Sequence, residues 1–362
     1  MSPQKKILIA CGGTGGHLFP GIAVAESLLA QGHEALLLIS QKKIDSQASA
    51  KYPHLTFKVV PAIAKPATLS PKMIPFLWAL FQSIRTSKKI IREFGADAVL
   101  GMGGFTSLPP VYAGHSLGKK TFVHDSNARP GKANILTSRF CTKVFIGLQP
   151  AATFFKAPTQ HTGTPARPEI VNLPSRAEAA ERFGLDPNKQ TILVTGGSQG
   201  ALGLNQLTAK TAPLLPDDIQ ILHIAGPNDR ERIAEENPVQ RPGYKLIGFC
   251  DQMPSAYALA DLVIARSGAS TLTEISLAAL PSILVPYPYA ADDHQTANAK
   301  VFSDAGAAKL IQQKDLTPES LAKFLSALLT NPGELKNMSQ ASKSLAIPDA
   351  ADQVTAAILQ ER

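Results

Sequence analysis

The sequence has 362 residues, 44% of them hydrophobic and 6% aromatic, which is ordinary for an α/β protein and suggests two domains of about 150 to 180 residues each. The net charge of +8 favours an acidic partner, namely phosphates, nucleic acid or an anionic membrane, and does not choose among them. Three widely spaced cysteines predict neither a disulfide framework nor a zinc site, so we expect a reducing, cytoplasmic setting. No run reaches about 18 apolar residues and the first apolar run begins at Ile7, so we expect neither a membrane span nor a signal peptide.

The first predicted elements lie in the stretch Lys5–Ala25. An apolar run ends at Ala10, the loop GGTGGH (Gly12–His17) follows, and a helical pattern comes next, which predicts strand, glycine loop and helix. Glycines let backbone N–H groups approach a ligand, and the positive end of the helix dipole favours an anionic or oxygen-rich one. His17 is the side chain of this loop that can take a proton near neutral pH. The alternative is a tight turn in which His17 only caps or packs locally.

Spacing excludes the two commonest nucleotide loops. A dinucleotide fingerprint needs a third glycine where Leu18 stands and an acidic residue after the next strand, where the sequence has Ser40 and Gln41. A Walker loop needs its second glycine where His17 stands. Neither nucleotide fingerprint therefore accounts for the loop.

Apolar runs alternate with helical patterns along the chain, which predicts parallel sheets with helices on both faces. In the first half the predicted strands are Ile7–Ala10, Ala35–Ile39, Thr56–Val60, Ala98–Met102, Thr121–His124 and Lys143–Ile146. A turn-rich stretch, Thr159–Pro168, predicts a linker. Beyond it the predicted strands are Gln190–Thr195, Ile219–Ile224, Lys245–Ile247, Leu262–Ala265 and Ser282–Val285, with a surface helix over Ala350–Gln360. We therefore predict an α/β fold of two Rossmann-like domains with a deep interdomain cleft.

The segment Lys72–Lys89 departs from this alternation. Its first part is apolar nearly all round, and basic residues follow. The segment is too short to span a bilayer but suits a patch that enters the membrane interface while its cations meet anionic headgroups. The alternative is a well-buried helix.

A second glycine loop, Gly196–Gly200, matches the G-x-S-x-G nucleophile elbow of α/β-hydrolases, and Asp261 and His294 follow in the chain order of a hydrolase triad. A hydrolase reading explains nothing about the glycine loop of the first half. We therefore favour a phosphate held by Ser198 and the neighbouring N–H groups.

Two later segments carry further polar groups. Arg266–Glu274 combines a strand end, a glycine turn and a helix start, which suits a diphosphate, and Glu274 suits sugar or ribose hydroxyls; a merely capped helix is the alternative. Asp292-Asp293-His294 lacks a spacing that would single out a metal, so we expect polar contacts to a sugar there.

Two further loops of the first half follow strands and should lie at the same sheet edge as the His17 loop. They are Gly101–Ser107 and His124–Asn127. Asp125 either orients and assists His17 or caps the helix that follows.

Across nearly its whole length, from Lys6 to about Asp352, the chain resembles the MurG family, in the motifs GGTGGHLFPGIAVAESL, LGMGGFTSLP, VHDSN, GTPAR, GGSQGALGLN, ARSGASTLTEI and DDHQTANA. Members are peripheral-membrane glycosyltransferases that add N-acetylglucosamine to undecaprenyl-pyrophosphoryl-N-acetylmuramyl-pentapeptide. The resemblance implies a glycosyltransferase B fold, UDP-N-acetylglucosamine as donor, inversion at the anomeric carbon, and neither metal nor other cofactor. It also implies an acceptor- and membrane-binding domain over 1–163, joined by a last helix at 346–362, and a donor-binding domain over 164–345.

The resemblance also distributes roles among residues. The acceptor is assigned to Gly13, Gly103, Gly104, Phe105 and Thr106. The donor is assigned to Thr14, Gly15, Gly16, Asn127, Arg167, Ser198, Gln199, Arg266, Ala269, Ser270, Thr271, Glu274, His294 and Gln295. The membrane patch is Ile74, Leu77, Trp78, Phe81, Arg85 and Lys88. We favour His17 as the base that takes the proton of the attacking C4 hydroxyl, with Asp125 as the other candidate. Asp125 departs from the family in standing where Glu is common.

The family's setting is peptidoglycan synthesis at the cytoplasmic face of the bacterial inner membrane, in support of cell shape and division. It implies lipid I, an anionic phospholipid surface and further cell-wall synthesis proteins as partners, and no nucleic acid. Two other functions stay open. A UDP-N-acetylglucosamine 2-epimerase shares the two-domain architecture and donor but has no use for the apolar patch, and a noncatalytic nucleotide-sugar binder needs none of the acceptor loops.

Overall fold

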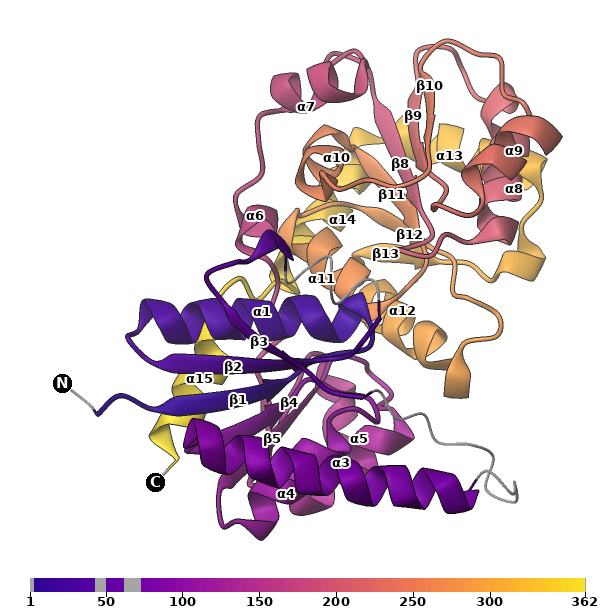
Figure 1. The fold of residues 1–362 in the computed structure, drawn as a ribbon. Coiled ribbons are helices and arrows are strands. Elements are labelled where there is room, and N and C mark those ends of the chain that lie inside the picture. Colours follow the sequence, from indigo (N-terminus) through magenta and orange to yellow (C-terminus); the bar gives the residue numbers. More distant parts are fainter. Residues whose placement is uncertain (1–2, 43–49, 62–72, 362) are drawn as a thin grey trace. The chain divides into compact units, whose positions relative to one another are not determined.

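A computed structural model describes residues 3–42, 50–61 and 73–361, and the contacts of the chain divide it into two compact units (Figure 1). Unit 1 comprises Met1–Arg167 and Ile347–Arg362, and unit 2 comprises Pro168–Ala346. Lys72, the first residue of the predicted membrane segment, lies outside the described residues.

The sheet of unit 1 has, within the described residues, seven parallel strands in the order β3-β2-β1-β4-β5-β6-β7. They are β1 (Lys6–Ala10), β2 (Glu34–Ile39), β3 (Thr56–Val59), β4 (Ala98–Gly101), β5 (Lys120–Asp125), β6 (Lys143–Ile146) and β7 (Thr159–His161). The central strand β1 is almost wholly apolar because helices cover both of its faces.

Five helices cover this sheet, counting only the described residues. They are α1 (Gly15–Ala30), α3 (Met73–Phe94), α4 (Leu108–Ser116), α5 (Lys132–Thr137) and α15 (Ala350–Gln360). One apolar core joins α1 and α15 to the sheet, through residues such as Ile22 and Val354, and a second joins α3 and α4 through Ile90 and Val111. Figure 1 shows α1 and α3 on opposite faces of the sheet. Ser27 on α1 donates to Asp352 on α15 at 2.6 Å, which fixes the last helix on unit 1.

Unit 2 repeats this plan with, as far as the described chain shows, six parallel strands in the order β10-β9-β8-β11-β12-β13. The strands are β8 (Thr191–Thr195), β9 (Gln220–Ile224), β10 (Tyr244–Ile247), β11 (Leu262–Ala265), β12 (Ser282–Leu284) and β13 (Ala308–Leu310). The helices are α6 (Pro168–Val171), α7 (Arg176–Phe183), α8 (Leu202–Thr211), α9 (Arg230–Glu236), α10 (Met253–Leu259), α11 (Ala269–Leu277), α12 (His294–Asp304), α13 (Pro318–Leu329) and α14 (Pro332–Ser344).

Both sheets therefore follow the Rossmann order, in which the strand order reverses beside the first strand. In unit 1 the reversal lies between β1 and β4, and in unit 2 between β8 and β11. Loops that follow these four strands flank the position where such sheets bind ligands. Each of the four loops contains glycine.

Every strand predicted from the sequence is confirmed to within one or two residues, and two strands were missed. β7, Thr-Gln-His, lies inside the predicted linker Thr159–Pro168, so the prediction of a plain linker is wrong there. It is a polar edge strand and so lacks an apolar run that could reveal it. β13 is only three residues long.

Candidate functional site

His17 lies in the first turn of α1, because the helix begins at Gly15 and not after the loop. Thr14 precedes α1, and its hydroxyl does not cap the helix. Instead its Oγ1 lies 3.2 Å from His17 Nδ1. When Nδ1 donates its proton to Thr14 Oγ1, Nε2 of His17 carries a lone pair that can accept another proton.

The loop after β4 lies against the imidazole of His17. Gly103 and Gly104 have φ angles of 115° and 72°, which side chains rarely adopt. A Cβ on Gly103 would stand 3.0 Å from His17 Nε2, and one on Gly104 would stand 3.0 Å from its Cε1. Thr106 of this loop donates to Gly12 O at 2.9 Å, which joins the two glycine loops. Because Gly103 and Gly104 have no side chain, the backbone of this loop can pack directly against the imidazole.

Asp125 is buried at the end of β5, with 2% of its surface exposed. Its carboxylate accepts from Asn127 N at 2.9 Å, Asn127 Nδ2 at 3.3 Å, Gly131 N at 3.2 Å and Asn134 Nδ2 at 2.7 Å. Burial raises the pKa of Asp125, and the hydrogen bonds oppose this shift. The carboxylate is therefore engaged in holding the loop that follows β5.

Asn134 on α5 connects this loop to the loop beside His17. Its Nδ2 donates to Asp125, and its Oδ1 accepts from Gly104 N at 3.1 Å. A Cβ on Gly103 would also stand 3.1 Å from Asn134 Nδ2. Asp125 thus reaches the surroundings of His17 through Asn134, which the sequence did not single out because it lies in an unremarkable helical segment.

The glycine turn of unit 2 connects β8 to α8. Gly197 and Gly200 have φ angles of 84° and 77°, and Gly200 N donates to Gly197 O at 3.0 Å. Ser198 and Gln199 are exposed at the tip of the turn. The residue before α8 is Ala201, whose side chain cannot cap the helix. The turn and the helix start therefore offer backbone N–H groups to an anion.

The turn after β11 shows the same plan with a buried cation. Gly268 precedes α11, and Ala269, Ser270 and Thr271 form its first turn, half-buried. Arg266 is 5% exposed and donates to Val285 O at 3.0 Å, Pro286 O at 2.9 Å and Gln313 Oε1 at 2.5 Å. Burial lowers the pKa of Arg266 to about 10. Its guanidinium thus supports the loop that follows β12.

The polar segment before α12 is bound to this turn. Ser267 donates to Gln295 O at 2.8 Å, and Asn298 donates to Ser267 O at 3.0 Å. Gln295 Oε1 accepts from Tyr287 N at 2.9 Å. His294 begins α12 and donates from Nδ1 to Ala291 O at 2.9 Å, so its Nε2 is the nitrogen that can face a ligand.

Glu274 lies on the second turn of α11, where Tyr257 donates to its Oε2 at 2.9 Å. The tyrosine fixes the orientation of the carboxylate.

The hydrolase triad is not assembled. Asp261 precedes β11 and is held by Arg176 at 2.8 Å and by Thr191 N at 2.8 Å. Ser198 follows β8, which runs parallel to β11, so the two side chains belong to opposite edges of the sheet. Ser198 is therefore not the nucleophile of such a triad.

Comparison with known proteins identifies the family. The Glycosyltransferase family 28 N-terminal domain matches residues 7–146, and the C-terminal domain of that family matches residues 191–354. The chain belongs to glycosyltransferase family 28. It is 37% identical over 368 residues to the UDP-N-acetylglucosamine--N-acetylmuramyl-(pentapeptide) pyrophosphoryl-undecaprenol N-acetylglucosamine transferase of Geobacter sp. (strain M21), covering 99% of this chain and 97% of the relative.

Solved structures agree with this family. The crystal structure of Acinetobacter baumannii MurG superposes with a TM-score of 0.78 at 29% identity, covering 99% of this chain and all of that one. A UDP-GlcNAc 2-epimerase from Neisseria meningitidis superposes with a TM-score of 0.70 at 16% identity, over 98% of this chain and 100% of that one. The second match shows a shared fold alone. The MurG structure and the two family-28 domains confirm the glycosyltransferase B architecture expected from the sequence.

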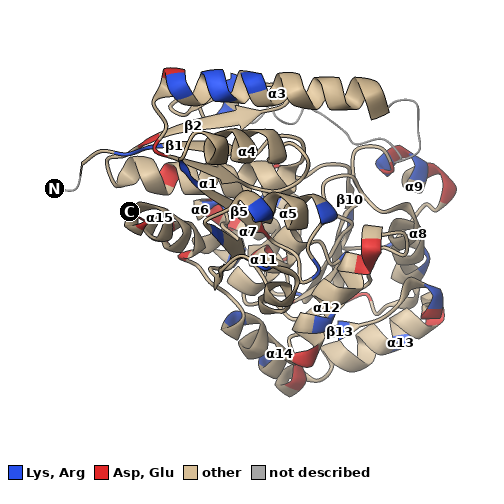
Figure 2. Cartoon of the chain, turned by 90° about the horizontal axis from the view of Figure 1, so that it is seen from below, with Lys and Arg blue, Asp and Glu red and all other residues tan. Residues whose placement is uncertain are grey.

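Within this family-28 chain, α3 carries the predicted membrane patch on an exposed face. Ile74, Leu77, Trp78 and Phe81 are 78%, 55%, 64% and 48% exposed, so the alternative of a well-buried helix is wrong for this part. Their spacing places them on one side of the helix. Figure 2 shows the N-terminal half of α3 without charged residues and Lys and Arg on its C-terminal half. Arg85 lies 5.8 Å from the ring centre of Phe81, so apolar and basic groups adjoin.

The inner face of α3 touches the loop after β4, which the resemblance assigns to the acceptor. Phe76 is buried and meets Phe105 edge-on, with ring centres 5.7 Å apart. The exposed apolar residues of α3 are therefore held beside the loop Gly103–Thr106 by a direct aromatic contact.

Arg167, assigned to the donor, is the last residue of the first segment of unit 1. Its guanidinium lies over the ring of Phe19 on α1, 4.8 Å from the ring centre. The aromatic face holds the cation near the start of α1.

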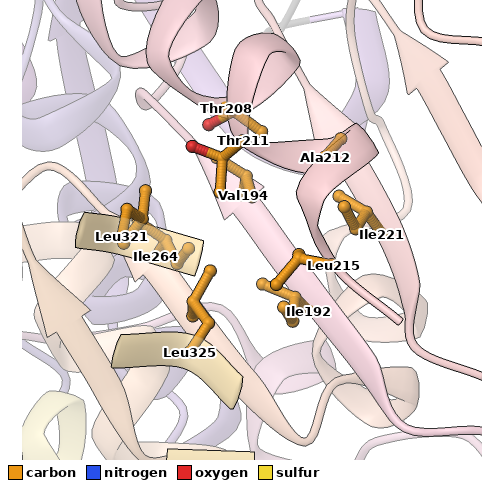
Figure 3. A pocket seen from close by; sticks show the side chains of 10 residues that line it. All are labelled: Ile192, Val194, Thr208, Thr211, Ala212, Leu215, Ile221, Ile264, Leu321 and Leu325. Atoms are coloured by element: carbon orange, nitrogen blue, oxygen red, sulfur yellow. The ribbon is translucent and has the colours of Figure 1, made fainter. Parts of the chain in front are cut away.

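A small cavity lies in the core of unit 2, under β8 (Figure 3). Its volume is about 10 Å³, and its lining includes Ile192, Ile221, Ile264 and Leu325. It has room for about one water molecule at most and cannot hold a nucleotide sugar.

None of the helices in the described residues is long and apolar enough to cross a membrane. No group of three or more His, Cys, Asp and Glu side chains in that part of the chain is placed to hold a metal ion.

Proposed function

We propose that this protein transfers N-acetylglucosamine from UDP-N-acetylglucosamine to the C4 hydroxyl of undecaprenyl-pyrophosphoryl-N-acetylmuramyl-pentapeptide, the step from lipid I to lipid II of peptidoglycan synthesis. The proposal rests on sequence identity of 36–37% over nearly the whole chain to transferases that carry out this reaction by name. The loops that the chemistry needs stand at the strand ends where both sheets bind ligands.

Proton removal is assigned to His17. The C4 hydroxyl attacks C1 of the donor sugar from the face opposite UDP, its oxygen forms the new glycosidic bond, and its proton passes to His17 Nε2. Thr14 orients the ring through Nδ1, and the backbone of Gly103 and Gly104 packs close to the other side of the ring because these residues have no side chain. Asp125 accepts four hydrogen bonds from its own loop and α5, so we assign it a positioning role through Asn134.

Donor binding is assigned to unit 2. As the bond from C1 to the diphosphate breaks, UDP leaves with its negative charge, which N–H groups at the starts of α8 and α11 can stabilise. Glu274 suits the ribose hydroxyls, and His294 and Gln295 suit the sugar. We also propose Arg167, which belongs to unit 1, as a cation for the diphosphate. The proposed reaction uses neither a metal nor another cofactor.

The lipid-linked acceptor explains the exposed face of α3. We propose that the patch of Ile74, Leu77, Trp78 and Phe81 enters the interface of an anionic membrane while Arg85 and Lys88 meet its headgroups. The Phe76 and Phe105 contact then brings the acceptor loop to the membrane surface, where lipid I resides. This places the enzyme peripherally at the cytoplasmic face of the bacterial membrane, where other cell-wall synthesis proteins are expected partners.

Incubation with radiolabelled UDP-N-acetylglucosamine and a prenyl-pyrophosphoryl muramyl acceptor tests the function. Label in the lipid product supports transfer. Isomerised donor without lipid product would instead indicate the 2-epimerase, and donor binding without any chemistry would indicate a nucleotide-sugar binder.

A further inference from the structure

A series of hydrogen-bonded polar side chains, half-buried at Tyr244 and buried at His223 and Asn205, crosses unit 2 toward the glycine turn at 196–200. Tyr244 on β10 contacts His223 on β9, with 2.7 Å between the phenol oxygen and Nδ1. His223 Nε2 in turn lies 3.0 Å from Asn205 Oδ1 on α8. His223 and Asn205 are both 0% exposed, so their hydrogen-bonding groups depend on one another.

The direction of each hydrogen bond in this series follows from its last acceptor, the carbonyl oxygen of Ala225. Ala225 O can only accept, and it lies 2.8 Å from Asn205 Nδ2, so the amide group of Asn205 points its NH₂ there. Its Oδ1 therefore faces His223 and accepts from Nε2–H. Nδ1 is left without a proton and accepts from the hydroxyl of Tyr244.

Burial supports this arrangement of protons. It lowers the pKa of His223 to about 4, so the ring is neutral with a single N–H at neutral pH. It also raises the pKa of Tyr244, which keeps the phenol as a donor. The three side chains therefore form a one-way relay of donors.

The relay ends on the backbone that the glycine turn touches. Asn205 Nδ2 also donates to Asp229 Oδ2 at 2.9 Å. A Cβ on Gly200 would stand 2.2 Å from Ala225 O and 3.2 Å from Asp229 Oδ2, and one on Gly226 would stand 2.5 Å from Gly200 Cα. Asn205 thus holds both groups that define the wall of the turn.

We propose that His223 is a positioning residue for donor binding: by fixing the amide of Asn205, it sets the shape of the turn whose N–H groups receive the donor diphosphate. The inference rests on the proposed function for the identity of the ligand. His223 itself lies behind the turn and acts only through Asn205.

Two amide variants distinguish the roles of the two ring nitrogens of His223. In His223→Gln the amide nitrogen can reach the place of Nε2 and still donate to Asn205. In His223→Asn the shorter amide reaches only the place of Nδ1, so Asn205 Oδ1 loses its donor. We expect His223→Asn to raise the KM for UDP-N-acetylglucosamine about 10-fold, with kcat and the KM for the lipid acceptor within about 2-fold of the parent. His223→Gln should stay within about 2-fold in all three constants.

Calorimetric binding of UDP to the same proteins should repeat this split, since it reports only on folded molecules. Equal donor KM values in the two variants, or a parallel change in donor and acceptor constants, would overturn the relay. Amide hydrogen exchange at residues 196–201 gives a test without any ligand: exchange should quicken in His223→Asn and not in His223→Gln, and unchanged exchange in both would also overturn it. If the parent protein fails to bind UDP while exchange shows the expected split, the proposed donor is wrong and the relay stands.

Discussion

The two glycine loops that follow the first strand of each sheet have the same topology and different chemistry. In unit 1 the loop and its neighbours present ionisable side chains, with His17 beside Gly103 and the Lys42 ammonium 2.8 Å from Gly13 O. In unit 2 the turn presents backbone N–H groups, with only Ser198 and Gln199 at its tip. In the proposed mechanism, one Rossmann sheet moves a proton and the other holds an anion, which suits a transferase whose two substrates have separate needs.

Replacement of His17 tests the unit 1 side of this comparison most strongly. His17→Ala should lower kcat about 100-fold or more because general-base catalysis contributes that much, while UDP binding stays nearly unchanged. Steady-state transfer and UDP calorimetry measure the two effects. His54→Ala is the control, since His54 is a surface residue paired with Glu26. A fully active His17→Ala enzyme would show that His17 is not the general base.

Substitution of Gly200 tests the unit 2 side. A side chain there meets Ala225 O and a φ of 77°, so Gly200→Ala should weaken UDP binding about 30-fold, as measured by calorimetry. Gly184→Ala is a matched control, because Gly184 has a φ of 66° with open space around it. It should cost about 1 kcal/mol of stability and leave UDP binding intact. Equal affinities in the two variants would argue against an anion site in this turn.

Each unit also contains one buried neutral histidine, His124 on β5 and His223 on β9. Burial lowers both pKa values to about 4, against about 6.5 in the unfolded chain. Below about pH 6.5 the unfolded chain binds more protons than the folded one, so stability falls with pH until about pH 4. From pH 6.5 to pH 5 each histidine should cost about 1.5 kcal/mol of stability.

Urea unfolding followed by circular dichroism at these two pH values measures this loss. His223→Gln should abolish the pH-dependent loss of stability that His223 causes in unit 2 and leave the loss that His124 causes in unit 1. An unchanged pH dependence in this variant would show that His223 is not the group that titrates.

The smallest expected effect concerns the membrane patch of unit 1. Trp78→Ser should lower partition into vesicles of anionic phospholipid about 10-fold, because a large exposed apolar side chain no longer enters the interface. Leu214→Ser is the control, since Leu214 is 50% exposed in unit 2. Co-sedimentation with vesicles measures both, and equal losses would contradict a patch confined to α3.

Much of the fold was predictable because the strands are short apolar runs that alternate with helical patterns. β7 was not, since Thr159–His161 pairs only through its backbone at a sheet edge. The start of α1 at Gly15 was also missed, because glycines predict a loop while here they form the first helical turn. For α3 the composition allowed both burial and exposure, and only packing decided between them.

The positions of the site loops were predictable for a related reason: parallel strands bring their carboxyl ends to one edge. The contacts that organise those loops were not. Asn134 and His223 act on residues 9 to 30 positions away in the sequence, and nothing in their own helix or strand marks them. Arg266 was expected at the donor phosphates, and its guanidinium donates to two backbone carbonyls and Gln313.

The position of α15 has a consequence for how the chain is made. Unit 2 is one continuous segment, whereas unit 1 is completed by a helix that follows unit 2 in the sequence. A ribosome therefore releases all of unit 2 before Val354, Ala357 and Ile358 can cover α1. Until then the apolar face of α1 around Ile22 and Leu28 is not covered by α15. Unit 1 is therefore the first unit to be synthesised and the last whose core is completed. Translation speed through the last helix should accordingly affect the aggregation of nascent chains more than translation speed through unit 2.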